Sequence, residues 1–199
     1  MNRASRIAMV AFAAFALVGG STVSATTVLK LSMKDLARKS DTIVRARVED
    51  AVARYDTNKE IYTYFTLKVL DPVKGSRKDD IITIRQLGGV VDHIASIVPG
   101  MPTFKKGEEV VVFLTQKDAA GYPWVMGLQQ GKFTISQDEN GQKNVRNELD
   151  GTKLVGANGT LFEGAKVTPN MPLQAFLDGI RTDLNDAGKI QVDPTHQTE

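Results

Sequence analysis

Residues able to do acid–base, nucleophilic or metal chemistry are few in this 199-residue chain. It has two histidines and no cysteine, which excludes thiol catalysis, disulfides and thiolate metal sites. Asp92-His93 is the one acidic–histidine pair, and the sequence supplies no partner for it, while His196 stands apart near the C-terminus. No serine lies in a Gly-x-Ser-x-Gly motif. We therefore predict a protein that is not an enzyme and that has no metal or cofactor, with a hydrolase as the least favoured alternative.

Glycine pairs and aromatic residues offer the remaining interaction chemistry. Gly88-Gly89 and the segment 127–131 are not phosphate loops, because neither precedes the start of a helix. Five aromatic residues form either a binding face or ordinary packing: Tyr55, Tyr62, Tyr64, Tyr122 and Trp124. The packing interpretation includes Tyr62 and Tyr64 lying opposite Arg45 and Arg47 across the first hairpin.

The N-terminal residues indicate the compartment. Arg3 and Arg6 precede an apolar run at residues 7–20, and small residues follow at Val23-Ser24-Ala25. We interpret residues 1–25 as a signal peptide, which makes the protein exported, either periplasmic or secreted, with Thr26 as its first mature residue. The alternative is an uncleaved anchor, although the run is shorter than the roughly 20 residues that span a bilayer. No membrane association is expected after cleavage.

The charge of the mature chain argues against polyanionic partners. Removing residues 1–25 takes away two basic and no acidic residues, which leaves 23 of each sign. A neutral chain gives no electrostatic reason to expect nucleic acid or anionic lipid as a partner.

Hydrophobic periodicity predicts a mainly β domain over residues 26–186. In the stretch 61–69, Ile61, Phe65 and Leu67 share one face while Tyr64 and Lys68 share the other, the pattern of a half-buried strand. Similar signals predict strands at 44–49, 82–88, 110–114, 124–128, 132–136 and 143–149, whereas residues 90–104 are weakly patterned. Short strands at this spacing are typical of a barrel or sandwich.

Two helices flank the predicted strands. Ser32 and Asp35 have the spacing of a capping box, so a short helix begins there and ends near Ser40. Pro172 opens a second, amphipathic helix over about 172–186, whose apolar stripe includes Leu173, Phe176 and Ile180. Residues 187–199 are polar and are expected to form a flexible tail.

The opening strands resemble a known family. The segments that carry the likeness are 40–48, 61–69, 73–75 and 80–84, which resemble the netrin-like OB-fold of tissue inhibitors of metalloproteinases. Residues 100–114 also resemble a pattern, G-x-P-x-F-x-x-G-E-x-V-x-x-F-L, shared by uncharacterised exported bacterial proteins. The resemblance implies an OB-like partly open β-barrel that serves binding. Those inhibitors begin with a disulfide-bonded cysteine that chelates the protease zinc, whereas Thr26 stands here.

These observations favour an exported, non-catalytic module that binds a protein partner, with an exported metalloprotease as one candidate. The alternative is a structural or assembly protein of the cell envelope. Loops at one rim of the barrel are expected to carry recognition, and the predicted partner-binding residues are Thr26, Tyr55, Asp56, Gly88, Gly89 and His93.

Overall fold

The structure is a computed structural model that describes residues 27–147, 149, 153–155, 160–162 and 170–189. The predicted signal peptide, Thr26 and residues 190–199 of the predicted tail lie outside the described residues. No helix within the described ranges is long and apolar enough to cross a membrane.

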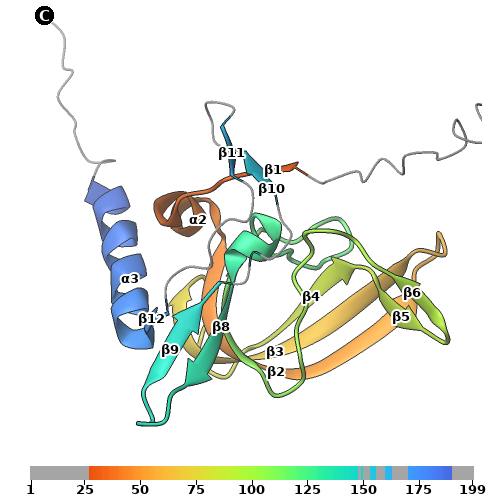
Figure 1. Ribbon diagram of the computed structural model, residues 1–199, viewed down its shortest axis with the longest axis horizontal. Helices are drawn as coiled ribbons and strands as arrows, with labels where there is room; N and C mark the ends of the chain where they lie inside the picture. The colour runs from red at the N-terminus through yellow and green to blue at the C-terminus, as the bar shows by residue number, and fades with distance from the viewer. Residues whose placement is uncertain (1–26, 148, 150–152, 156–159, 163–169, 190–199) are drawn as a thin grey trace, which may run out of the picture.

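A seven-stranded antiparallel sheet forms the body of the domain (Figure 1). Its strands, in spatial order, are β12 (Met171–Pro172), β9 (Lys143–Arg146), β8 (Lys132–Gln137), β7 (Glu109–Leu114), β2 (Thr42–Tyr55), β3 (Ile61–Lys74) and β4 (Ile81–Leu87). The predicted mainly β class, with one short N-terminal and one C-terminal helix, is confirmed. The sheet stays open and does not close into a barrel.

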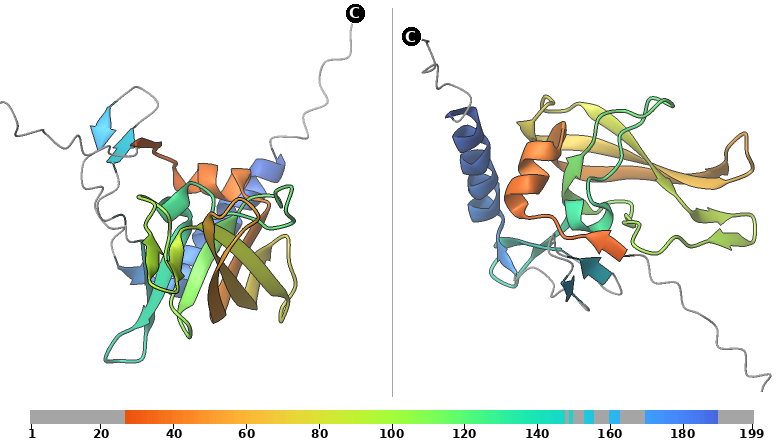
Figure 2. Two further views of the ribbon diagram at one scale, coloured as in Figure 1. Left: turned by 90° about the vertical axis from the view of Figure 1, so that its right-hand side faces the viewer. Right: turned by 90° about the horizontal axis from the view of Figure 1, so that it is seen from above.

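The two helices pack beside each other against one side of the sheet (Figure 2). Helix α2 (Met33–Lys39) begins with the predicted capping box: the Ser32 hydroxyl accepts from the Asp35 backbone N–H at 3.0 Å, and the Asp35 carboxylate accepts from the Ser32 backbone N–H. Helix α3 (Leu173–Lys189) starts directly after Pro172 and continues past the predicted end at 186. Its stripe of Leu173, Phe176, Leu177 and Ile180 is buried against the sheet.

The other side of the sheet encloses a second core. This core contains alternate residues of three strands, among them Val44 of β2, Leu67 of β3 and Val110 of β7. Strand β4 contributes Ile84. As predicted, Phe65 and Leu67 are buried whereas Tyr64 and Lys68 are more exposed. The alternation in β3 therefore separates a core face from a partly exposed face.

Two smaller sheets complete the fold. β1 (Thr27–Leu29) pairs in parallel with β10 (Lys153–Val155), which pairs with β11 (Leu161–Phe162). β5 (Gly89–Val91) and β6 (Ile94–Ser96) form a hairpin within the segment that the sequence left weakly patterned.

The predicted strand at 124–128 is wrong. Val125 makes one isolated bridge with Leu114, and the 3₁₀ helix η1 (Leu128–Gly131) follows. Gly127 adopts a left-handed conformation with φ of 65°, which interrupts the extended backbone before η1.

Candidate functional site

Two hairpins lie side by side at one end of the domain (Figures 1 and 2). One is the far end of β2 and β3, and the other is β5–β6. Gly89 brings them together so closely that a Cβ at this position would lie 2.3 Å from Thr63 Oγ1 and 3.0 Å from Ala53 Cβ. Because Gly89 also has φ of 139°, only glycine fits here without strain.

This end holds most of the predicted binding residues. Tyr55 and His93 are exposed in the two hairpins, and Gly88-Gly89 turn the chain from β4 into β5. The Asp56 carboxylate instead shapes its own turn, since Oδ1 accepts the backbone N–H groups of Asn58 at 2.9 Å and Glu60 at 2.8 Å.

A cavity of about 540 Å³ opens beside the β5–β6 hairpin. Its walls are the adjoining ends of β3 and β4, the start of β5, the segment 95–103 and Gln129, and none of the lining residues carries a charge. Two of its aliphatic lining side chains face solvent: Val90 is 66% exposed and Ile97 87%. A concave, uncharged cavity with an apolar rim is the common form of a binding site.

Gln86 is the unusual residue of this cavity. It lies on the core-facing side of β4, in register with Thr63 on β3, and is 3% exposed. Neither its amide nitrogen nor its amide oxygen has a hydrogen-bond partner among the described residues. Sequence reasoning missed it, although the signal was present: Gln86 continues the apolar series of Ile82 and Ile84 at a period of two.

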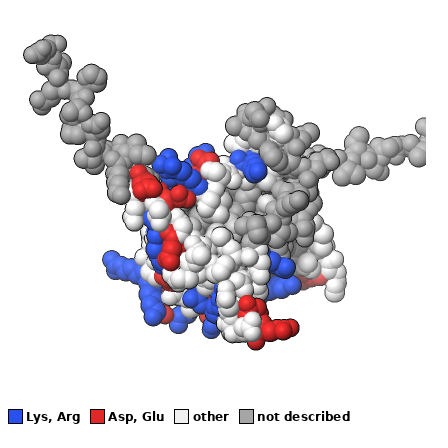
Figure 3. All heavy atoms as spheres, turned by 60° about the vertical axis from the view of Figure 1, so that its left-hand side comes forward, with Lys and Arg blue, Asp and Glu red and all other residues white. Residues whose placement is uncertain are grey.

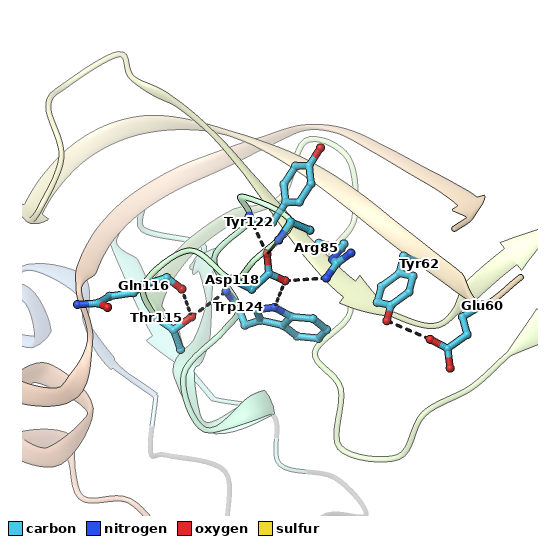
Figure 4. Close-up of polar contacts among 9 residues, drawn as sticks. Glu60, Tyr62, Arg85, Thr115, Gln116, Asp118, Tyr122 and Trp124 are labelled. Carbon is cyan, nitrogen blue, oxygen red and sulfur yellow. Dashed lines mark hydrogen bonds and ion pairs between the residues drawn. The ribbon is translucent and has the colours of Figure 1, made fainter. Parts of the chain in front are cut away.

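On the opposite face of β4, an aromatic cluster surrounds Arg85 (Figure 4). The Arg85 guanidinium carbon lies 4.5 Å from the ring centroid of Tyr62 and 5.6 Å from that of Trp124. Edge-to-face contacts join Tyr62 to Trp124 and Tyr64 to Tyr122, with centroids 6.3 Å and 5.2 Å apart. The structure thus unites four of the five aromatic residues singled out from the sequence.

Asp118 organises this cluster and the loop 115–124. Its Oδ2 accepts from Arg85 Nη2 at 2.6 Å and from Trp124 Nε1 at 2.8 Å, and its Oδ1 accepts the backbone N–H groups of Ala120 and Tyr122. Burial raises the pKa of Asp118, but the hydrogen bonds from Trp124, Tyr122 and Arg85 outweigh burial and hold it below its usual value. We interpret the cluster as a clamp that fastens the loop to β4.

The predicted pairing of the two tyrosines with Arg45 and Arg47 is wrong. Tyr62 lies opposite Arg54, and the Arg54 guanidinium carbon lies 3.8 Å from the ring centroid of Tyr64. The hairpin is longer than the sequence suggested, so the register places the tyrosines near its tip.

Arg45 and Arg47 instead surround a carboxylate on β7. Glu109 accepts from Arg45 at 2.8 Å, from Lys143 at 2.8 Å and from Arg47 at 3.3 Å. Burial raises the pKa of Glu109, but hydrogen bonds from Lys143 and Arg45 outweigh burial and lower it to about 2. The cluster ties β2, β7 and β9 together. None of its residues lines the cavity.

Among the described residues, no group of three or more histidine, aspartate or glutamate side chains is arranged to hold a metal ion. Comparisons with protein-family models, curated proteins and solved structures found no match.

Proposed function

We propose that the protein is an exported, non-catalytic binding module that captures an apolar segment of a protein partner at the cavity beside the β5–β6 hairpin. The observation that carries this proposal is the exposed aliphatic rim of Val90 and Ile97 around an uncharged cavity. Exposed aliphatic side chains grouped at one concavity are typical of a protein–protein contact.

The size and charge of the site support a protein partner. The cavity volume is within the range of ligand-binding pockets, roughly 300–1,000 Å³, while the exposed Ile94 adds apolar surface elsewhere on the β5–β6 hairpin. On the face shown in Figure 3, basic and acidic side chains both occur. The signal-peptide pattern and the neutral mature chain favour export and argue against nucleic acid.

A matched pair of substitutions tests the proposal. Val90 and Ile81 are both β-branched strand residues with similar exposure, 66% and 60%, but Val90 lines the cavity whereas Ile81 lies at the opposite end of β4 from it. We would select peptides from a random phage-displayed library on the immobilised protein and measure their affinities by isothermal titration calorimetry. We expect apolar peptides to be enriched, Val90→Lys to weaken binding by about tenfold or more, and Ile81→Lys to leave it unchanged.

Two outcomes would contradict the proposal. One is the absence of any enriched peptide. The other is equal weakening by Val90→Lys and Ile81→Lys when both variants keep the wild-type melting temperature, because a binding surface around the cavity requires the two positions to differ.

A further inference from the structure

Gln86 is buried without a hydrogen-bond partner at the wall of a cavity. Its amide atoms are closed to solvent, and both lack a partner among the described residues. The nearest cross-strand hydroxyl is already committed, since Thr63 Oγ1 donates to the Gly88 carbonyl oxygen at 2.7 Å. Buried polar groups in folded proteins are nearly all paired, so this side chain points to a missing partner.

The chemistry of a carboxamide limits what that partner can be. Its oxygen accepts hydrogen bonds and its nitrogen donates them, so it pairs best with a group that has one donor and one acceptor close together. A peptide bond is such a group. Charged groups fit poorly, because the lining of the cavity has no charged residue to neutralise them and their desolvation is costly.

We propose that the Gln86 carboxamide recognises a backbone peptide group of the bound partner, next to an apolar side chain that enters the cavity. The inference rests on the proposed function and names the ligand: an uncharged, extended peptide segment. The apolar side chain binds among residues such as Val98 and Met101, and the adjacent peptide group approaches Gln86. Because both amide atoms of Gln86 are closed to solvent in the free protein, binding has to uncover them. Apolar walls exclude water, which strengthens hydrogen bonds made inside the cavity.

An amide-to-ester scan tests the hydrogen bond directly. The probe is the tightest peptide selected from the random library, together with analogues in which each backbone amide is replaced in turn by an ester, which removes one N–H donor. For the wild-type protein we expect one ester position to weaken binding by about tenfold, whereas the other positions have smaller effects. Gln86→Met, which keeps an unbranched side chain of similar length, should weaken the all-amide peptide by a similar factor.

Measuring the ester peptide on the Gln86→Met variant separates loss of this one hydrogen bond from general damage to the binding site. In Gln86→Met the sensitive ester should cost no further affinity, because its partner is already absent. The melting temperature of Gln86→Met should equal or exceed that of the wild type, since the substitution removes a buried unpaired amide. If the variant does not fold, the ester scan on the wild type still tests the inference, because the absence of a sensitive position overturns it.

The outcomes distinguish this inference from the proposed function. Binding that depends on Val90 but shows no sensitive ester position overturns the recognition of a peptide group by Gln86 and leaves the proposed function standing. The same ester sensitivity in the wild type and Gln86→Met has the same meaning. Failure to enrich any peptide overturns both.

Discussion

Arg85 and Gln86 are consecutive residues of β4, yet their side chains meet opposite conditions. Arg85 lies in the aromatic cluster and makes a 2.6 Å ion pair with Asp118, whose carboxylate accepts four hydrogen bonds in all. Gln86, on the other face of the same strand, is buried beside a cavity, and its carboxamide makes no hydrogen bond with the part of the chain that the structure describes.

The contrast separates two uses of buried polar groups. A group whose hydrogen bonds are satisfied within the chain fastens one element to another, as Asp118 fastens the loop 115–124 to β4. A group left without partners destabilises the free protein by about 1–3 kcal/mol, a cost that an incoming partner could remove. Because side chains alternate along a strand, these two kinds of polar group can stand at consecutive residues.

Arg85 and Gln86 differ in this way only if the cavity beside Gln86 lies outside a well-packed core. Phe65 forms the boundary, because it is buried against Phe104, with ring centroids 4.9 Å apart, and also lines the cavity. We expect Phe65→Ala to lower the free energy of unfolding by roughly 3–5 kcal/mol in urea denaturation. The control Lys68→Ala, on the opposite face of β3, should stay within about 0.5 kcal/mol. Comparable losses from the two variants would show that the region around Phe65 is loosely packed.

Removing Asp118 should break the clamp but not the cavity. Asp118→Ala leaves Arg85 partly buried without its ion pair, so we expect a loss of roughly 2–4 kcal/mol in the free energy of unfolding. Asp50→Ala is the matched control, because the Lys106–Asp50 pair is exposed and should contribute less than about 1 kcal/mol. An Asp118→Ala variant as stable as Asp50→Ala would mean that the cluster is not a clamp.

Acid should release the clamp through the Asp118 carboxyl group. Its folded-state pKa is held below the usual 3.8, so its contribution to stability is complete above about 3.8 and is lost as the pH falls through the lower folded-state value. Trp124, the single tryptophan, donates to Asp118 and should report the change in its fluorescence. We expect an acid transition in the wild type that is absent in Asp118→Asn. A transition of the same midpoint in both proteins would assign it elsewhere, with Glu109 as the next candidate because it titrates near pH 2.

Local pattern predicted the elements whose packing follows from alternation or capping. Phe65 and Leu67 were placed on the buried face of β3, and Ser32 was placed at the start of α2, because both depend on neighbours within a few residues. The apolar stripe of α3 was recognised for the same reason.

The features that the sequence did not predict depend on contacts between residues far apart in the chain. β2 continues to Tyr55, well past the predicted end at 49, because its exposed half is held by pairing with β3 rather than by an apolar face. The cavity required the backbone path of residues 88–103, which two positive-φ glycines turn away from β4. The missing partners of Gln86 could not be read from the sequence, because a lack of contacts is a property of the assembled fold.

The long β2–β3 hairpin has a consequence for the order in which the chain assembles. Its two 14-residue strands are joined by a turn at residues 56–60, so their contacts close short loops and lose little chain entropy. β1 and β10 instead pair Thr27 with Lys153, from distant parts of the sequence, and can align only after most of the chain has been made. We therefore expect the hairpin to form early in folding and the β1–β10 pairing to form late.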